Sequence, residues 1–574
     1  MIDLPAELWT QIFDLAADED VLFAPGLPGV SPMAESAWFK NFHGAWSLRT
    51  PGDAVEMVQR RSYATKKAIV RTCKRWREIG SEFLFRCLFF SDPGRLVALA
   101  NLLDASAATS STAATSTDPA GSSANAAAPP LGWWTRRIHV TRFYASHARG
   151  TTPILLQDAL IRVIRHCPNL QIFIVNWPLT ASTFGPVADA LAVHARGSLS
   201  TLAVTVPAGA LGKVIWALEG LRRVGAVHIE LEYDGQAEER GFLASSAQEE
   251  DYERASVVSD DPALGAAGDI RLTLPNLQQL SLKGHIQQFV EQASGWDLPV
   301  LRHLSVDCPR TTDLPDVVCF LTAHGPSVIH LDLEALPSLP VQQILARCPE
   351  LRTMTFNGDW RIVGAEDDSS SSGPSPPLAH DKLMNVGLSG LSYAFGVGFG
   401  AADGVSALVA TSVNDRTIQA LCDKTAFPSL HRLRVLSRGL LMDLEKADGP
   451  STEGGGMSRW ERWWSMTAGA GVRLEDCTGA LLGELPQDLD DGDFSDDDDS
   501  DEEDDEDEAE VEEQLLQDGW KHAPTSNTAG SLNELRKLLE ECRAMDRGRD
   551  DNYLHRSAAG AMMIPGFSAD DTGS

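Results

Sequence analysis

Few side chains in this chain have the types and spacing that a catalytic or cofactor site requires. The nearest candidate is Gly396-Val-Gly398-Phe-Gly400-Ala401, which fits the glycine pattern of a dinucleotide-binding turn. Such a turn also needs a βαβ unit and an acidic residue ending its second strand, and Asp415 is distant. Motifs of phosphate-binding loops, zinc proteases and serine hydrolases do not occur. We therefore expect a binding protein that is not an enzyme and uses no cofactor or metal.

The histidines and tryptophans favour structural roles. His324, His330 and His431 lie near predicted strand starts, where an imidazole is expected to be exposed or hydrogen-bonded within the protein. For three tryptophans at the i, i+3, i+4 spacing of one helix face, core packing or an end cap is expected, with an aromatic ligand patch as the alternative. These are Trp460, Trp463 and Trp464.

Cysteine usage and apolar runs bear on the compartment. The nine cysteines are scattered, odd in number and free of Cys-x-x-Cys spacing, which favours a reducing compartment, cytoplasmic or nuclear. The N-terminus lacks the basic start and apolar run of a signal peptide. An uncharged stretch, Leu383–Ala402, is about long enough to cross a bilayer. Its five glycines and few large aliphatic residues favour a Gly-rich repeat or loop, so no membrane partner is expected.

Acidic residues are concentrated in one part of the chain. The net charge is -33, and residues 488–513 contain 19 acidic and no basic side chains. An acidic protein repels nucleic acid phosphates, so no nucleic acid partner is expected. Ser495 and Ser500 each precede three acidic residues, a pattern that resembles casein-kinase-two substrates and predicts phosphorylation. A solvated tail without regulation is the alternative.

A short phrase that recurs six times identifies the elements that carry these residues. It consists of a proline followed by apolar residues two, five and seven positions later, as in Pro299, Leu301, Leu304 and Val306. Proline cannot continue a preceding helix, and the last two apolar residues alternate as one face of a strand does. Each phrase therefore predicts a helix that stops before a short strand. The six prolines are Pro168, Pro275, Pro299, Pro326, Pro349 and Pro428.

Repetition of this unit predicts a solenoid. Consecutive prolines from Pro275 to Pro349 are 24, 27 and 23 residues apart, within the range of roughly 20–29 residues that leucine-rich repeats show. A seventh copy without the proline begins at Leu199, and Val227–Leu231 is a degenerate copy. The sequence predicts an α/β solenoid, similar to leucine-rich repeats with short parallel strands and helices, over residues 136–485. Solenoids usually bind other molecules.

Composition sets the boundaries before the solenoid. Residues 1–90 are expected to form a small all-α module with a long inserted loop at 18–62, and helical periodicity resumes at 64–90. Residues 91–135 are expected to be a flexible linker. Within it, 104–130 contain no large apolar residue, so burial cannot offset the entropy of ordering them.

Polar composition marks further segments. Insertions near 235–268 and 364–380 are expected to be disordered loops between repeats. An acidic disordered tail is expected at 486–530. A capping box and apolar spacing then predict an amphipathic helix at 531–545. Residues 546–574 are expected to be a disordered tail.

The two N-terminal helical segments resemble an F-box. The segment Leu4–Trp9, which reads Leu-Pro-Ala-Glu-Leu-Trp, and the pair Ile12-Phe13 resemble the first helix of that family. The segment Cys73–Trp76 has the Cys-x-x-Trp element of its second half. The insertion at 18–62 departs from the compact family pattern and is similar to fungal F-box proteins. The match covers under a tenth of the chain.

The resemblance implies a role in ubiquitin ligation. F-boxes are helical hairpins that bind the Skp adaptor of an SCF-type cullin-RING ubiquitin ligase, and through it the cullin, while the downstream domain captures a protein substrate. The expected interface inserts apolar side chains of two helices into an adaptor groove. The residues that match the apolar motif positions, and are expected to bind the adaptor, are Leu4, Pro5, Leu8, Ile12, Phe13, Val70, Cys73 and Trp76.

Two other classes of function remain open from the sequence. One is a repeat-based interaction scaffold without a ubiquitin role, whose N-terminal helices only cap the solenoid. The other is a factor whose acidic run binds basic proteins. Exposure of the N-terminal helices distinguishes the ligase receptor from the scaffold. An adaptor-binding helix must expose its apolar face, whereas a cap buries that face on the first repeat.

Overall fold

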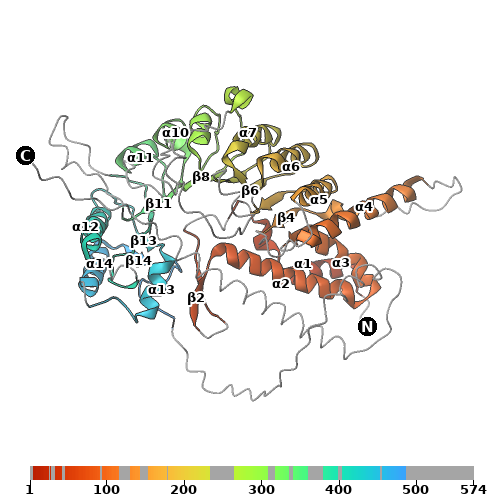
Figure 1. Cartoon of the computed structure of the whole chain (residues 1–574). Helices are drawn as coiled ribbons and strands as arrows, with labels where there is room; N and C mark the ends of the chain where they lie inside the picture. Colours follow the sequence, from red (N-terminus) through yellow and green to blue (C-terminus); the bar gives the residue numbers. More distant parts are fainter. Residues whose placement is uncertain are drawn as a thin grey trace, which may run out of the picture. The chain divides into compact units, whose positions relative to one another are not determined.

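The structure, a computed structural model, is an α/β arrangement in which a row of parallel strands carries helices along one side (Figure 1). One unit of the chain comprises Met1–Phe39 with Trp46–Leu485, and a second comprises Lys40–Ala45 with Pro486–Ser574. The residues that the structure describes are 4–24, 26–27, 33–41, 45–90, 93–115, 129–141, 153–177, 179–232, 264–307, 317–334, 341–359, 379–398, 404–452 and 455–486.

Within these ranges, 12 strands form one sheet in sequence order, and every adjacent pair is parallel. Each connection therefore returns the chain to the next place in the row, as in a solenoid. This confirms the predicted α/β architecture of parallel strands and helices. The strands are β3 (Cys87–Phe90), β4 (Arg137–Val140), β5 (Ile172–Val175), β6 (Thr201–Pro207), β7 (Ala226–Glu232), β8 (Gln279–Gly284), β9 (His303–Asp307), β10 (His330–Glu334), β11 (Thr353–Asn357), β12 (Asn385–Ser389), β13 (Arg432–Val435) and β14 (Arg473–Glu475).

The register aligns the apolar positions of the repeated phrase. Leu304 lies opposite Leu280 on one neighbouring strand and Leu331 on the other. These three side chains are at most 2% exposed. In all six copies, the apolar residues two, five and seven positions after the proline are buried, so the predicted strands and their inward faces are confirmed.

Helices cover the face of the sheet to which these apolar residues point (Figure 1). Leu160, Val187 and Val214 from successive helices share one continuous core with the strands. The helices predicted before Pro168, Pro326 and Pro349 are confirmed. The helices of this part are α5 (Pro153–Arg165), α6 (Ala181–His194), α7 (Leu211–Gly220), α9 (Gln287–Ala293), α10 (Val317–His324), α11 (Val341–Arg347) and α12 (Gly404–Leu421).

Two helices, α13 (Arg438–Lys446) and α14 (Gly456–Ala470), complete the C-terminal part of the sheet's core. Trp463 is fully buried, its ring centroid lies 5.1 Å from that of Phe395, and its Nε1 donates to Asp415 at 2.7 Å. The predicted core packing of this tryptophan is confirmed.

The N-terminal helices differ from the prediction in one boundary. Helix α1 (Ala6–Ala17) lies where it was expected, but α2 (Pro51–Thr72) begins inside the segment predicted to be a loop over 18–62, and α3 (Lys74–Arg86) follows. The reason is local, because the side chain of Thr50 accepts from the Asp53 amide while Asp53 accepts from the Thr50 amide. This capping box satisfies amides at the helix start.

Shorter elements occupy the rest of the predicted loop. They are the 3-10 helix η1 (Asp20–Phe23) and a two-stranded sheet of β1 (Ala37–Lys40) and β2 (Trp46–Arg49). The predicted all-α module of 1–90 therefore contains strands, and its last residues, Cys87–Phe90, are the first strand of the large sheet.

The flexible linker predicted over 91–135 is wrong where the structure describes it. Helix α4 (Pro93–Thr115) buries Leu96, Ala100 and Leu103 in the main core, each at most 1% exposed, and η3 (Leu131–Trp134) precedes β4. Alanine has the highest intrinsic helix propensity, so an Ala-rich composition favours a helix once one face is anchored. Residues 116–128 lie outside the described residues.

Several predictions of disorder fall mostly outside the described ranges. Within the insertion predicted near 235–268, the structure describes residues 264–268. Most of these belong to the 3-10 helix η6 (Gly265–Asp269), so the predicted loop extends too far toward the C-terminus. Four other predicted segments lie outside the described residues, apart from residues 379, 380 and 486. They are 364–380, 486–530, 531–545 and 546–574.

The described part of the uncharged stretch Leu383–Ala402, which ends at residue 398, forms β12 and the turns that follow it. Gly398 has a φ of +61°, and the carboxylate of Asp443 fills the space that a Cβ would take, so packing accounts for this glycine. Across the ranges given above, no helix combines the length and the apolar composition needed to span a bilayer.

Candidate functional site

Helix α1 packs on α2 and α3 through one side. Phe13 is 2% exposed, and its ring centroid lies 5.2 Å from that of Trp76 and 6.3 Å from that of Phe83. Trp9 lies 4.7 Å from Trp76 by the same measure. Together with Ile69 these side chains form a small core that is distinct from the core of the sheet. The helical module therefore has its own packing.

The other side of α1 carries apolar residues that the described chain leaves exposed. Leu8 is 43% exposed, Ile12 is 42% exposed and Leu15 is 82% exposed. Their spacing of i, i+4 and i+7 places them in one row along the helix. We call these three residues the α1 ridge. It has the chemistry of a surface that another protein covers.

The remaining residues predicted to bind an adaptor lie at the start of α1 and around the junction of α2 and α3, which are joined by a hydrogen bond from Arg75 Nη2 to the Leu4 carbonyl at 2.7 Å. Leu4 is half-buried and Pro5 is exposed at the start of α1. Val70 is half-buried near the end of α2. The Sγ of Cys73 accepts from the Trp76 amide at 3.4 Å and so caps α3. Trp76 and Cys73 therefore have structural roles within the module.

A buried ion pair fixes the turn after α1. Lys66 Nζ donates to Glu19 Oε1, and the two side chains are 2% and 5% exposed. Arg86 Nη1 lies 3.5 Å from the other Glu19 oxygen and 2.6 Å from Asp14 Oδ1. A buried charge that lost its partner would be costly, so these pairs hold the three helices in one arrangement.

The second face of the sheet is polar between β8 and β13. Its side chains alternate with the buried apolar rows, and residues in one row lie opposite one another on successive strands. We call it the polar face. One row contains Gln279, His303, His330, Thr353, Asn385 and Arg432, and the next contains Ser281, Ser305, Asp332, Thr355, Gly387 and Arg434.

Residues of α2 and of the stretch between α1 and α2 lie against the second face of the sheet. Near β4, Gln59 Oε1 is 3.1 Å from His139 Nδ1. Further along, the amide of Leu27 donates to Gln279 Oε1 at 2.9 Å, and Leu27 packs on Ala203. We call residues 26–27 and 33–36 the covering segment. The segment predicted to be only a loop thus contacts strands far away in the sequence.

Arg434 attaches the covering segment at the other end of the polar face. Its Nη1 donates to the carbonyl of Met33 at 2.8 Å, and its Nη2 donates to Glu35 at 3.1 Å. Nε and Nη2 donate to Glu475 Oε2 at 3.1 and 2.8 Å. Arg434 is 2% exposed, so these bonds are largely protected from water.

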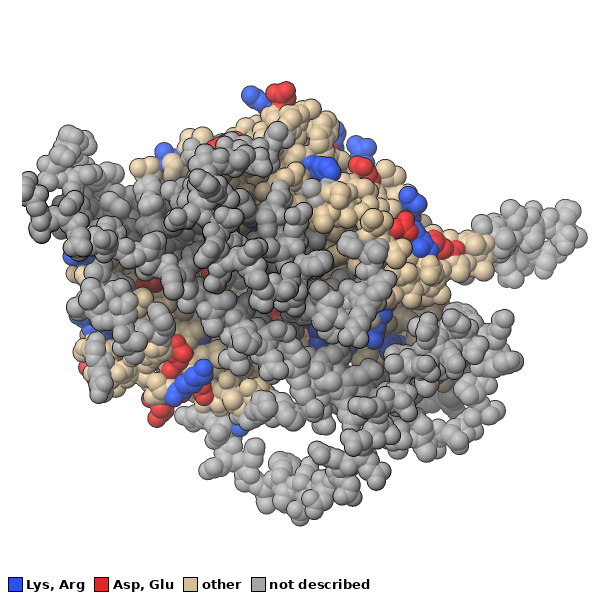
Figure 2. Space-filling view, viewed as in Figure 1, with Lys and Arg blue, Asp and Glu red and all other residues tan. Residues whose placement is uncertain are grey.

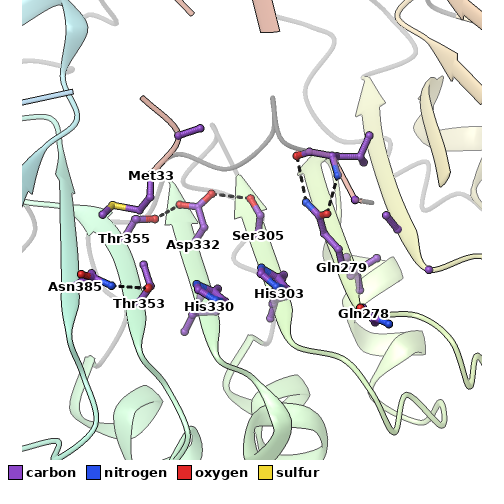
Figure 3. A pocket seen from close by; sticks show the side chains of 18 of the residues that line it. Met33, Gln278, Gln279, His303, Ser305, His330, Asp332, Thr353, Thr355 and Asn385 are labelled. Atoms are coloured by element: carbon purple, nitrogen blue, oxygen red, sulfur yellow. Dashed lines mark hydrogen bonds between the residues drawn. The ribbon is translucent and has the colours of Figure 1, made fainter. Parts of the chain in front are cut away.

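A cavity of about 680 Å³ lies between the covering segment and the polar face. This is within the size range of small-ligand sites, roughly 300–1,000 Å³. Figure 3 shows His303 and His330 side by side on neighbouring strands, with Ser305 and Asp332 further along and Met33 near Thr355. The cavity is lined by polar groups of several strands, among them Gln278, Gln279, His303, Ser305, His330, Asp332, Thr353, Thr355 and Asn385.

The two cavity histidines form a flat, uncharged pair. Their ring centroids are 4.3 Å apart and their planes differ by 8°. Burial, then the neighbouring His303 and Arg352, lowers the pKa of His330 to about 4. Burial also lowers the pKa of His303. Both imidazoles are therefore neutral at pH 7.

Two carboxylates line the cavity, Glu35 of the covering segment, which pairs with Arg434, and Asp332 on β10. Asp332 Oδ2 accepts from Ser305 Oγ at 2.6 Å, and its Oδ1 accepts from Thr355 Oγ1. Burial, with smaller contributions from Glu334 and Asp307, raises the pKa of Asp332 to about 7 despite these two donors. Among the described residues, no Lys or Arg side chain forms an ion pair with it.

Lys283 forms ion pairs with two carboxylates near Asp332, those of Glu230 and Asp307. Its Nζ lies 3.6 Å from Glu230 Oε1 and 3.9 Å from Asp307 Oδ2. Burial nevertheless raises the pKa of Asp307 to about 6. The Asp332 end of the cavity thus has more acidic than basic groups.

Charges are mixed on the described surface of the helices and of the turns between them. Arg162 pairs with Asp104 on α4 and lies 3.8 Å from Asp158, and Lys382 pairs with Glu350. Figure 2 shows Lys and Arg beside Asp and Glu on the visible part of the described surface.

The sequence prediction missed the cavity. It treated His330 as an exposed or internally satisfied imidazole and did not single out His303 or Asp332. A usable signal was present, because polar residues recur four and six positions after Pro299, Pro326 and Pro349. The covering segment had no such signal.

Two candidate sites therefore result, the α1 ridge and the cavity. Ser495 and Ser500 lie outside the described residues. Within the described ranges, no cluster of three or more His, Cys, Asp or Glu side chains could hold a metal ion. No protein-family model matches the chain, and no curated protein is significantly similar to it.

Proposed function

We propose that the protein is a substrate receptor of an SCF-type cullin-RING ubiquitin ligase, in which the α1 ridge docks on the Skp adaptor and the repeats bind a client protein. The observation that carries the proposal is the exposure of Leu8 and Ile12 on a helix that is already anchored elsewhere, through Phe13. An interface of two proteins in which a helix lies in an apolar groove needs anchors at this spacing.

The packing separates docking residues from structural ones. Leu8 and Ile12 occupy positions of the resemblance to an F-box and are exposed. Phe13 and Trp76 occupy other such positions, where Phe13 is in the core of the module and the half-buried Trp76 packs against it. Docking would cover the ridge without unfolding the module. This division supports the proposal for Leu8 and Ile12, and assigns Phe13 and Trp76 to holding the helices in place.

The runner-up is a scaffold whose N-terminal helices only cap the solenoid. A cap would bury the apolar side of α1 on the first strands and helices of the sheet. Instead, α1 packs on α2 and α3, and its core is distinct from that of the sheet. The α1 ridge, with Leu15 at 82% exposed, favours the receptor over the cap.

The test is binding of the full chain to a purified Skp adaptor by affinity capture and calorimetry. Leu8→Asp combined with Ile12→Asp should abolish binding, because charged side chains would have to enter an apolar groove. Val193→Asp is the matched control, because Val193 is an exposed apolar residue on α6, at 73%. Absence of adaptor binding by the unaltered chain would reject the proposal, as would equal loss with Val193→Asp.

A further inference from the structure

We propose that the cavity under the covering segment binds a guanidinium group, with Asp332 as its carboxylate partner and the uncharged His303–His330 pair beside it. The inference rests on the proposed function in one respect, namely that the guanidinium belongs to an arginine side chain of the client protein. An arginine side chain is then the feature of the client protein that the receptor binds.

Asp332 is a carboxylate whose hydrogen-bond acceptor sites are only partly used within the protein. A carboxylate offers about four acceptor sites, and Asp332 uses one on each oxygen for Ser305 and Thr355. One further site on each oxygen is left for a ligand. A guanidinium fits such a pair because it donates two parallel N–H bonds in a planar fork.

The second step is charge. Glu475, the buried carboxylate of β14, faces Arg432, Arg434 and Arg473 at 2.8–3.2 Å. Asp332 has no such cation among the described residues, and its nearest acidic neighbours are Asp307 and Glu334. A bound cation would complete this end of the cavity, whereas a bound anion would be repelled.

The third step is shape. His303 and His330 present a stacked pair of rings on the strands that also carry Ser305 and Asp332, two residues further along. Two residues of a strand span about 6.6 Å, which is within the reach of one arginine side chain. The two rings stack on each other, and both imidazoles are neutral at pH 7, so they do not repel a guanidinium that lies beside them.

The arginines at the opposite end of the cavity are already paired with carboxylates. Arg432 and Arg434 line the cavity, but Glu475 pairs with both and Glu35 of the covering segment pairs with Arg434. These arginines are therefore engaged within the protein. The Asp332 end is the part of the cavity whose charge is open to a ligand.

The experiment uses the full chain and three small probes, N-acetyl-arginine methylamide and its lysine and citrulline counterparts, followed by NMR or calorimetry. The arginine probe should bind saturably, and the uncharged citrulline probe, which has nearly the same shape, should bind at least about tenfold more weakly. Asp332→Asn should cause a similar loss. Glu350→Gln, which removes an exposed carboxylate outside the cavity, should bind like the unaltered chain.

The pH dependence is a second measurement that needs no variant. The groups facing Asp332 are Ser305, His303 and Asp307 from β9, Thr355 from β11, and His330 and Glu334 from its own strand. Only the ionised Asp332 pairs with the probe. With its pKa at about 7, affinity should rise about tenfold from about pH 6 to about pH 8.

Equal binding of the arginine and citrulline probes, equal binding of arginine and lysine, or undiminished binding by a folded Asp332→Asn chain would overturn the inference. If that variant does not fold, a pH-independent affinity of the unaltered chain would overturn it. Adaptor capture separates the two proposals, because Asp332→Asn should still bind the adaptor. Probe binding without adaptor binding would leave the cavity assignment standing and remove the ligase.

Discussion

Arg434 on β13 and Glu475 on β14 lie directly opposite each other in the sheet and share two hydrogen bonds, from Nε and Nη2 to one carboxylate oxygen, at 3.1 and 2.8 Å. Both side chains are at most 2% exposed. The same guanidinium donates to the carbonyl of Met33, 401 positions earlier in the chain. One side chain thus joins the end of the sheet to the residues that precede α2.

Arg434→Met should lower the free energy of unfolding by about 2–3 kcal/mol, since hydrogen bonds to charged groups contribute about 1.5–3 kcal/mol. The loss stays moderate because Arg432 and Arg473 still face Glu475. Glu35→Gln should cost less than about 1 kcal/mol, because its side chain is 64% exposed. Urea denaturation measures both, and equal costs would contradict the importance of burial.

Phe13→Ala and Leu8→Ala should differ in stability. Phe13 fills the core of the helical module, so its removal should cost about 3–5 kcal/mol. Leu8 is 43% exposed, so Leu8→Ala should lower the free energy of unfolding by less than about 1 kcal/mol. Thermal and urea unfolding of the full chain would show this, and a Leu8 variant as unstable as the Phe13 variant would mean that the ridge is not a free surface.

Gly387→Ala should loosen the covering segment. A Cβ at this position on β12 would lie 2.7 Å from Met33 Sδ and 2.8 Å from Thr355 Cγ2, closer than ordinary contacts. Hydrogen exchange of amides at 33–36 should therefore become faster, while exchange in α6 stays unchanged. Gly439→Ala is the control, because nothing lies within 4 Å of its Cβ position. Unchanged exchange at 33–36 would contradict the contact.

His139 should make the fold sensitive to acid. Burial, with Arg137 and Arg60 nearby, lowers its pKa to about 3, while an unfolded histidine titrates near 6.5. Between these values the unfolded chain binds the extra proton, so stability falls as pH falls, by up to about 1.4 kcal/mol per pH unit. Buried Asp332 and Asp307, whose pKa values are raised, act in the opposite direction.

His139→Gln isolates this contribution, because it leaves those carboxylates in place. Unfolding free energies from urea titrations between about pH 4 and about pH 7 should fall less steeply with acid in the variant than in the unaltered chain. The same slope in both proteins would show that His139 is not a source of the acid sensitivity.

The strands could be predicted from the sequence because their signal is local. Leu304 and Val306 alternate after Pro299, and burial of both is what an alternating strand requires. The start of α2 also has a local signal, at Thr50, Pro51 and Asp53, but the predicted loop over 18–62 extends past it. Proline is well tolerated in the first helical turn, so this predicted boundary is wrong.

The covering segment and the cavity could not be predicted in the same way. The bond from Leu27 to Gln279 joins residues 252 positions apart, and no periodicity encodes such a pair. Asp332 alone reads as an outward residue of a strand. Its chemistry arises because Ser305 and Thr355 flank it on neighbouring strands and Met33 lies nearby.

Helix α3 ends at Arg86 and β3 begins at Cys87, so no spacer separates the helices from the first strand of the sheet. A receptor built this way has no tether that could rotate or lengthen. A captured client would be presented at one angle and one reach from the adaptor. The choice of which lysine receives ubiquitin would then depend on the client's own surface geometry.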